Sequence, residues 1–365
     1  MSFVGVSKVK WRSLGIYRAP AGHIHASQEV LTKSVGLGHA PPTIRIVIYE
    51  PPAVTIGCNQ SVEEEVNLDK LRELGFEVMR RPTGGGAVLM TGPEGPDDAP
   101  GWEVYVPENL EGLPGEIDES FEYLSRPAVE FLRMLGLKAN FRYKNDIEVG
   151  GKKIAGVGQY RDSGGILHTG TFLLDFDVKL MLSVLKIPFE KISDKAIKSV
   201  EERLTTVKRE LGFKPSAEKL LELFEKAVEK AFNVEVFRGK LNDYEEKEFK
   251  KMLEKYYSEE WIYGLRPTME YTSILTKKTP GGLIRVHVKV SDNAIESIMF
   301  TGDFFIYPEK AIYDLEAYLK WSSIDEESVR ARICEFFEKT GAKILGLAPE
   351  ELADLGVNCI SKASG

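Results

Sequence analysis

Three consecutive glycines constrain this chain more than any other feature of its sequence. They stand in the segment RRPTGGGAVLM (residues 80–90), directly before an apolar run that is typical of a strand. Glycine adopts positive φ angles freely and has no Cβ, so such a run can bend the chain or bring backbone N–H groups against a ligand. Two interpretations stay open: a β-bulge or wide hairpin with solvated arginines, or a ligand-binding loop whose arginines pair with anionic oxygens. The spacing fits neither the Walker pattern nor G-x-G-x-x-G.

A second motif, KNDIEVGGKKIAG (residues 144–156), predicts a β-hairpin that turns at Gly150 and Gly151. The expected opposed pairs are Val149 with Lys152, Glu148 with Lys153, Ile147 with Ile154, and Asp146 with Ala155. Alternation then places Asp146, Glu148 and Lys153 on one face, with Asp146 diagonal to Lys153 at roughly 7 to 8 Å. One cation near two carboxylates suits an ATP site, where the ammonium holds phosphate or acyl oxygens and a carboxylate attracts Mg²⁺. A solvated cross-strand salt bridge is the alternative.

The histidine and the cysteines predict no covalent catalysis. His168, in LHTGTFLL (residues 167–174), stands alone at a strand, and no Ser-His-Asp or Cys-His arrangement has convincing spacing. Cys58 follows an apolar strand and is expected to be a buried thiol. Because Cys58, Cys334 and Cys359 are far apart in the sequence, neither a disulfide framework nor a zinc site is indicated, and a reducing cytoplasm is favoured.

Composition narrows the class of protein. The length of 365 residues predicts two, or three, domains, and the net charge of −8 argues against general nucleic-acid binding. The N-terminus lacks the apolar core of a signal peptide and no run approaches ~20 apolar residues, so a cytosolic protein without membrane spans is expected. Glutamine is rare while lysine and glutamate are plentiful, which favours a thermophilic source.

The patterning predicts α+β structure. Strands are expected at residues 43–50, 52–58, 76–90 (two strands around the glycines), 102–106, 141–160 and 165–177, and helices at 61–75, 120–135 and over most of 178–260. Pro127 is expected to interrupt the second helix. Beyond Arg266, alternating strands around an Asp-Asn turn and two following helices predict a small α+β domain.

Taken in order, five segments resemble the lipoate-protein ligase A family within the biotin and lipoyl ligase group. They are TIGCNQSVEEEVN, RRPTGGGAV, KNDIEVGGKKIAG, HTGTFLL and GLIRVHV with IMFTGDFF, and they span most of residues 40–357. The resemblance implies a catalytic domain with a mixed or antiparallel sheet of the class II synthetase-like kind at residues 1–266. It implies a small accessory α+β domain at residues 267–365.

The resemblance also implies the reaction. Lipoate and MgATP would form lipoyl-adenylate and pyrophosphate, and the acyl group would pass to a lysine on a lipoyl domain of a 2-oxoacid dehydrogenase E2 subunit or on glycine-cleavage H protein. Lys153 is implied as the catalytic residue, stabilising charge on the carboxylate and the α-phosphate as they join, and Asp146 is a candidate Mg²⁺ ligand. The implied substrate-binding residues are Arg81, Thr83, Gly84, Gly85, Gly86, Ala87, Asn145, Asp146, Gly156, Gly170 and Thr171.

One departure from the family pattern keeps rival functions open. A His-Asp pair usually follows the glycine loop, whereas this chain has Met90 and Thr91, so a catalytically silent binder of lipoyl groups or adenylates is one alternative. Biotin ligases share the second motif but not PTGGGAV. Related octanoyl transferases use a cysteine shortly before the Gly-Lys-Lys segment, and KANFRYKND (residues 138–146) has none. The segment FTGDFFIYPEKAIYDLEAYL could serve closure over the adenylate, acceptor docking or simple structural support.

Overall fold

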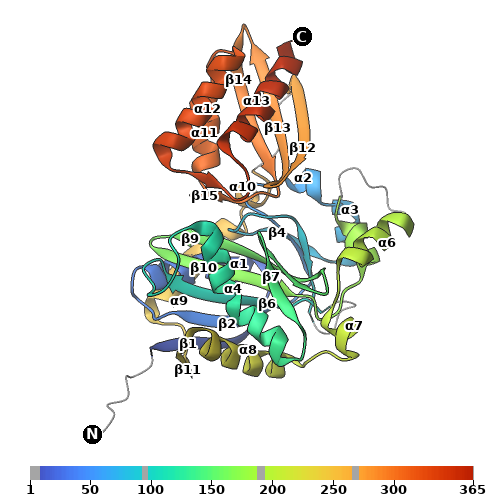
Figure 1. Cartoon of the computed structure of the whole chain (residues 1–365), viewed down its shortest axis with the longest axis vertical. Helices are drawn as coiled ribbons and strands as arrows, with labels where there is room; N and C mark the ends of the chain where they lie inside the picture. The colour runs from blue at the N-terminus through green and yellow to red at the C-terminus, as the bar shows by residue number, and fades with distance from the viewer. Residues whose placement is uncertain (1–8, 93–97, 187–193, 265–270, 365) are drawn as a thin grey trace. The chain divides into compact units, whose positions relative to one another are not determined.

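The computed structural model describes residues 9–92, 98–186, 194–264 and 271–364, which form two compact units (Figure 1). Unit 1 comprises Met1–Thr55, Asn67–Met79 and Leu89–Ser258, and unit 2 comprises Ile56–Val66, Arg80–Val88 and Glu259–Gly365. The glycine-rich segment therefore groups with the C-terminal part of the chain. The predicted domain boundary after Arg266 falls at residues 265–270, outside the described residues.

Unit 1 is built on an eight-stranded sheet with the strand order β11-β1-β2-β6-β10-β9-β8-β7. The strands are β1 (Lys10–Ala19), β2 (Thr43–Tyr49), β6 (Gly101–Pro107), β7 (Ala139–Arg142), β8 (Asp146–Val149), β9 (Lys152–Asp162), β10 (Gly165–Phe172) and β11 (Glu235–Arg238). β1 pairs in parallel with β2 and β11, whereas the other neighbours are antiparallel. The sheet is therefore mixed, as predicted.

The helices and a second, small sheet complete the elements between residues 21 and 256. The helices are α1 (Ala21–Gly36), α2 (Val62–Glu65), α3 (Leu68–Leu74), α4 (Ile117–Met134), α5 (Val178–Val184), α6 (Asp194–Arg203), α7 (Val207–Leu211), α8 (Ala217–Phe232) and α9 (Asp243–Tyr256). The small sheet has the order β4-β3-β5, from β3 (Ala53–Ile56), β4 (Glu77–Arg80) and β5 (Val88–Met90).

Neighbouring residues of β6 show that the large sheet is covered on both faces. The ring of Trp102 lies 5.8 Å from the ring of Phe224 in α8. Glu103, next along the strand, accepts a hydrogen bond of 2.7 Å from the side-chain amide of Gln28 in α1. Because successive side chains of a strand point to opposite faces, α8 covers one face of the sheet and α1 covers the other.

A buried charge network holds α1 to the sheet. Arg45 of β2 and Glu103 are 3% and 0% exposed and form an ion pair. The Tyr105 hydroxyl donates to the same carboxylate at 2.5 Å, and Arg45 also donates to the hydroxyl of Ser27 in α1 at 2.9 Å. A buried charge is tolerated only when partners replace its lost hydration. Burial also raises the pKa of Tyr105 well above its usual value, so the phenol stays protonated and donates.

Two helical predictions need correction. The single helix expected over residues 61–75 is two helices, α2 (Val62–Glu65) and α3, separated by extended backbone at Val66. Asn67 then caps α3 by accepting from the N–H of Lys70, and a polar residue that bonds the backbone in this way favours a helix start over a helix interior. The interruption expected at Pro127 is wrong, because α4 runs through this buried proline. Packing of its flanks against the sheet and α8 outweighs the intrinsic cost of proline.

The C-terminal part of unit 2 is an antiparallel meander packed against helices (Figure 1). Its elements are α10 (Glu259–Tyr263), β12 (Ser273–Thr279), β13 (Gly282–Ser291), β14 (Ala294–Gly302), β15 (Ile306–Tyr307), α11 (Ala311–Leu319), α12 (Glu326–Thr340), β16 (Lys343–Ile344) and α13 (Pro349–Ser364). Three helices follow the meander, rather than the two expected. The predicted turn at Asp292 and Asn293 is confirmed, with φ angles of 48° and 62°.

Among the helices that the structure describes, none has both the length and the apolar character to cross a membrane.

The buried network predicts an asymmetry between two identical substitutions. Glu103→Gln should lower the free energy of unfolding by about 3 kcal/mol, because it leaves the Arg45 guanidinium buried without its counter-charge. Glu222→Gln, at a half-exposed carboxylate that pairs with two lysines of α8, should leave the unfolding midpoint unchanged. Thermal and urea unfolding of both variants measure the difference, and equal midpoints would contradict the assigned role of the network.

Candidate functional site

The second motif forms the predicted hairpin with an altered register. Gly150 and Gly151 have φ angles of 59° and 77°, which is the signature of a two-residue turn. The pairs Val149 with Lys152 and Glu148 with Lys153 are found as expected. The other two predicted pairs are wrong, because Ile147 lies opposite Ala155 and Asp146 lies opposite Gly156. One extra residue in β9 therefore makes a β-bulge directly after Lys153.

The bulge accompanies a direct contact between the two key side chains of this motif. Lys153 Nζ lies 2.6 Å from Asp146 Oδ1, so the two side chains meet across the predicted diagonal of the hairpin. Glu148 instead lies 3.5 Å from Arg142. The side chains of Lys153 and Asp146 are 36% and 29% exposed. Both side chains are therefore partly accessible, and the buried part of Asp146 includes Oδ1.

Neighbouring backbone leaves room for the Lys153 side chain. A Cβ on Gly156 would lie 3.0 Å from Lys153 Nζ, so glycine lets the ammonium lie flat over β9. Thr171 of β10 lies directly opposite Gly156. Asn145 binds the backbone of Val157 twice, donating from its side chain at 3.2 Å and accepting at its carbonyl at 2.8 Å. The structure therefore brings the predicted Asn145, Asp146, Lys153, Gly156 and Thr171 together in unit 1.

Gly170, also predicted to bind substrate, has a packing reason to be glycine. A Cβ at this position would lie 2.5 Å from the indole of Trp102 and 2.6 Å from the carbonyl oxygen of Gly156. The Cα–Cβ direction at Gly170 therefore points to the α8 face of the sheet, and the Thr171 side chain points to the opposite face.

Residues 204–206 adjoin this site, which no pattern in the sequence indicated. The N–H of Thr205 donates to the carbonyl of Lys153 at 2.9 Å, and Leu204 forms a parallel bridge to Lys153. Thr205 is fully buried. These residues connect α6 to α7 and were included in an expected helical stretch, although the β-branched run Thr-Thr-Val is a poor helix interior.

Met90 and Thr91, where the family pattern breaks off, are both buried, and Met90 lies beside Thr171. The Thr171 hydroxyl lies 3.6 Å from the sulfur of Met90. The hydroxyl of Thr91 is buried and has no hydrogen-bond partner among the described residues. These two positions therefore carry a thioether and a neutral hydroxyl.

In unit 2, Arg81 organises the glycine loop (residues 83–87). Its guanidinium donates to the hydroxyl of Thr83 at 2.9 Å and to the carbonyls of Gly84 and Gly86 at 2.7 and 2.8 Å. Arg81, which the resemblance implies as a substrate-binding residue, thus donates these three hydrogen bonds to the loop itself. We conclude that Arg81 shapes the loop.

Close packing explains Gly84 and Gly85 of the loop, whereas a Cβ on Gly86 would make only an ordinary contact with Asp303, at 3.5 Å. A Cβ on Gly84 would lie 2.5 Å from the carbonyl oxygen of Phe304, and a Cβ on Gly57 would lie 2.1 Å from that of Gly85. Gly85 has a φ of +87°, and its N–H donates to the Phe304 carbonyl at 3.3 Å. The wide hairpin is excluded, because β4 and β5 flank β3 and do not pair with each other.

Arg80 has a different role from its neighbour. It is 2% exposed and donates to five backbone carbonyls, those of Gly57, Cys58, Gln60, Trp261 and Ile262. Burial lowers the pKa of Arg80. An arginine surrounded in this way is a structural cation and is not available to a ligand.

The other reactive side chains named above are structural. His168 is buried, with its ring nitrogens 2.9 Å from the Ser125 hydroxyl and 3.1 Å from the Gln159 side-chain amide. Burial, and secondly the charge of Arg161, lower the pKa of His168 to about 3. Burial raises the pKa of Cys58 to about 12, so this thiol is no nucleophile.

The predicted site residues thus fall into two groups. Unit 1 holds Asn145, Asp146, Lys153, Gly156, Gly170 and Thr171; unit 2 holds Arg81, Thr83, Gly84, Gly85, Gly86 and Ala87. The described residues contain no cluster of three histidine, cysteine or carboxylate side chains that could hold a metal ion. A single carboxylate such as Asp146 does suit Mg²⁺, which proteins commonly bind through one or two carboxylates together with substrate phosphates.

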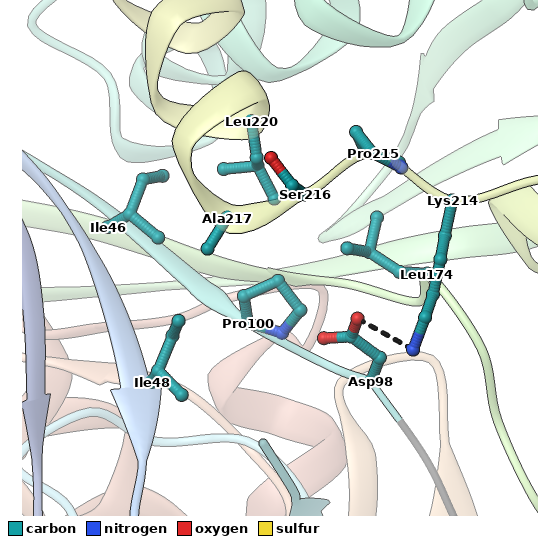
Figure 2. A pocket seen from close by; sticks show the side chains of 10 residues that line it. All are labelled: Ile46, Ile48, Asp98, Pro100, Leu174, Lys214, Pro215, Ser216, Ala217 and Leu220. Atoms are coloured by element: carbon teal, nitrogen blue, oxygen red, sulfur yellow. Dashed lines mark ion pairs between the residues drawn. The ribbon is translucent and has the colours of Figure 1, made fainter. Parts of the chain in front are cut away.

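A cavity of about 220 Å³ lies elsewhere in unit 1, at the start of α8 (Figure 2). Its lining is mostly apolar, and the ion pair of Asp98 with Lys214 (3.0 Å) stands at one side. Ile46 and Ile48 line it from the face of the sheet opposite to that of Thr171, so the cavity is separate from the Lys153 site. The lining residues are Ile46, Ile48, Asp98, Pro100, Leu174, Lys214, Pro215, Ser216, Ala217 and Leu220.

Comparisons with known proteins place these motifs in a family context. Residues 21–229 match the family model of the lipoyl protein ligase A/B catalytic domain, and residues 268–355 match that of the bacterial lipoate protein ligase C-terminus. An octanoyltransferase LipM of Kyrpidia tusciae is 30% identical, over 69% of this chain and 98% of its own. The lipoate-protein ligase LplJ of Bacillus subtilis is 29% identical, over 73% of this chain and 78% of its own.

A solved structure agrees with these matches. The bipartite lipoate protein ligase of Thermoplasma acidophilum, studied with its E2 lipoyl domain, superposes with a TM-score of 0.62 and 26% identity. The match covers 72% of this chain and 99% of that one. The predicted fold class, a ligase domain with a mixed sheet and a small α+β C-terminal domain, is confirmed.

The buried histidine predicts how stability depends on pH. The pKa of His168 is about 3 in the folded chain and about 6.5 when unfolded, so the unfolded state binds the extra proton between these values. The contribution of neutral His168 to the free energy of unfolding is thus fully present above pH 6.5. It is lost as the pH falls, by about 2 kcal/mol at pH 5. Unfolding midpoints of His168→Gln should fall less between pH 7 and pH 5 than those of the wild type. His39→Gln, at an exposed position, serves as the control, and parallel curves for all three proteins would refute the assignment.

Proposed function

Because this chain belongs to the lipoyl protein ligase A/B family, as its motifs predicted, we propose that it activates lipoate with ATP and attaches the lipoyl group to a protein lysine. The observation that carries this proposal is the accessible Lys153–Asp146 ion pair beside Gly156, Thr171 and Asn145. A preorganised cation beside small residues can receive the anionic groups of two substrates at once.

The first step joins an acid to a nucleotide. A carboxylate oxygen of lipoate attacks the α-phosphorus of ATP, a new P–O bond forms, and pyrophosphate leaves with the electrons of the broken bond. Lys153 serves as a fixed positive charge next to the carboxylate and the α-phosphate, whose mutual repulsion otherwise opposes the reaction. Its ammonium is held by Asp146 before substrates arrive, so the charge need not be reorganised during reaction.

Asp146 is the residue that would complete a Mg²⁺ site. The cation, which ATP brings bound to its phosphates, supplies further neutralisation of phosphate charge. Asp146 also keeps the Lys153 ammonium on the face of Gly156. A single carboxylate therefore orients one cation and offers an oxygen to another.

The second step transfers the acyl group. The neutral amine of an acceptor lysine attacks the carbonyl carbon of the mixed anhydride, an amide bond forms, the amine loses a proton and AMP leaves. We propose that the acceptor is a lipoyl domain, either of a 2-oxoacid dehydrogenase E2 subunit or of glycine-cleavage H protein. The solved ligase of Thermoplasma acidophilum, described with an E2 lipoyl domain, supports the first of these.

A second candidate function is transfer of an octanoyl group, because curated relatives of this chain include octanoyltransferases LipM. Transfer through a cysteine would need a reactive thiol near Lys153. The segment 138–146 has no cysteine, and Cys58 is a buried thiol of raised pKa. These observations favour activation by ATP, with octanoate as an alternative acid for the same site.

An acceptor-mass experiment tests the proposal and the choice of acid together. The protein is incubated with a purified lipoyl domain and lipoate, octanoate or an octanoyl-carrier protein, each with and without MgATP, and the intact mass of the acceptor is measured. We expect acylation that requires MgATP. Acylation from an octanoyl-carrier protein without ATP would favour the transferase. Binding of lipoate with no mass added under any condition would favour the silent binder.

A lysine pair within the hairpin tests the role of Lys153. Lys153→Ala should lower the rate of pyrophosphate release with lipoate by about 10²- to 10³-fold, the scale of losing one electrostatic contact in a transition state. Lys152→Ala, at the preceding residue and therefore on the opposite face of β9, should stay within about twofold of the wild type. Unchanged release by a folded Lys153→Ala protein would remove this residue from the mechanism.

A further inference from the structure

One face of the C-terminal sheet carries buried charges that the reaction described above does not use. Along β13, Ile284 and Val286 point into the core shared with α11, α12 and α13. Arg285 and His287 alternate with them and point to the other face, where Thr301 of β14 lies opposite Arg285. The exposed fractions of Arg285, His287 and Thr301 are only 6%, 0% and 0%. A sheet face without helices is normally solvated, so another segment must cover these residues.

That segment is α2, which follows β3 in the sequence and belongs to unit 2. Glu65 forms an ion pair of 2.5 Å with Arg285. Glu64 accepts a hydrogen bond of 2.9 Å from the Thr301 hydroxyl and lies 3.3 Å from His287 Nε2. Glu64 also lies near Arg285, with 3.7 Å between Oε2 of Glu64 and Nη1 of Arg285. We call these five residues the α2 cluster: Glu64, Glu65, Arg285, His287 and Thr301.

Residues 57–59, just before α2, connect the α2 cluster to the glycine loop. Asn59 accepts from the N–H of Gly302 at 2.9 Å and donates to the Phe304 carbonyl at 3.3 Å. The same Phe304 carbonyl accepts the N–H of Gly85. Gly57 packs so closely under Gly85 that no side chain fits between them. Residues 57–59 and Phe304 are therefore direct supports of the loop.

We propose that the α2 cluster is a positioning device, by which the C-terminal part of the chain holds the glycine loop in the shape required for substrate binding. The role of the loop in binding the acid rests on the function proposed above, whereas the anchorage rests on the contacts alone. A loop with three glycines has many accessible conformations and few side chains to fix it. Its order must therefore come from neighbouring segments, and the α2 cluster fixes one of them.

The test compares two arginines of unit 2. Arg285→Met removes the positive charge that pairs with Glu64 and Glu65 and keeps much of the side-chain volume. Arg330→Met removes the exposed ion pair with Asp354 between α12 and α13 and is the matched control. Hydrogen exchange of the full-length proteins is followed in peptides covering residues 56–61 and 80–88, and in a peptide of unit 1 covering residues 146–160. The KM for lipoate and the kcat of pyrophosphate release are measured in parallel.

We expect exchange in residues 56–61 and 80–88 of Arg285→Met to accelerate about tenfold, as for a local loss of order, with no change in residues 146–160. The KM for lipoate should rise by a similar factor, and kcat should change less than KM, because Lys153 keeps its own partner. Arg285→Lys should restore part of both effects. Arg330→Met should match the wild type throughout.

Two results would overturn the proposal: unchanged exchange in residues 80–88 of a folded Arg285→Met protein, or equal acceleration in unit 1, which indicates a general loss of stability. Should Arg285→Met fail to fold, Glu65→Gln decides by the same exchange criteria, since it keeps the side-chain shape and removes only the charge. The exchange readout needs no catalysis. A wild type that releases no pyrophosphate would refute the proposed function and leave the exchange result to decide the anchorage.

Discussion

The contacts of a single guanidinium hold unit 2 together as a discontinuous structure. Arg80 donates to carbonyls on both sides of a long gap in sequence, at residues 57–60 and at residues 261–262. In return, the indole N–H of Trp261 donates to the carbonyl of Arg80 at 3.0 Å. Because five carbonyls take the place of water around the buried charge, removing the cation would leave several acceptors unsatisfied at once. The supports of the glycine loop depend on this arrangement.

The two arginines of the glycine motif illustrate how adjacent, chemically identical residues acquire different roles. Arg80 belongs to the end of β4 and points into protein, whereas Arg81 follows the strand and folds back onto the loop. Neither guanidinium is presented as an isolated anion-binding group. In the proposed function, the charge offered to substrate is that of Lys153, whose ion pair with Asp146 is about one-third exposed. The buried Arg80 and the partly buried Arg81 both order the backbone, whereas Lys153 contacts a side chain, that of Asp146.

Local sequence patterns predicted the elements whose causes are local. The turn at Gly150 and Gly151 follows from their positive φ angles, and the strands around it follow from alternation. The bulge after Lys153 does not follow from alternation, since it depends on how β9 meets its neighbours. Likewise, α1 has little amphipathic signal because most of its residues are buried between β-strands and α9, so no helix was predicted there.

The features that local sequence patterns did not predict depend on contacts between residues far apart in the sequence. Nothing near residue 65 in the sequence indicates that Glu65 meets Arg285, 220 positions away. The same holds for Thr205 beside Lys153 and for Phe304 under the glycine loop. Family resemblance predicted which residues form the site but not their contacts, and the structure shows that Arg81 hydrogen-bonds to the glycine loop. The sequence did not predict which side chains and backbone groups contact each other over long range, because these contacts depend on the whole fold.

Unit 2 is built from three separate segments of the chain, which limits how such a protein can be split into two polypeptides. Residues 56–66 and 80–88 lie within the stretch that matches the catalytic family model, yet they pack with the C-terminal part. In one chain, these partners are present at an effective concentration set by the connecting polypeptide, of the order of millimolar for short flexible connections. A version split into two polypeptides would have to reassemble this packing from dilute solution. Covalent continuity therefore makes the order of the glycine loop independent of how much protein the cell contains.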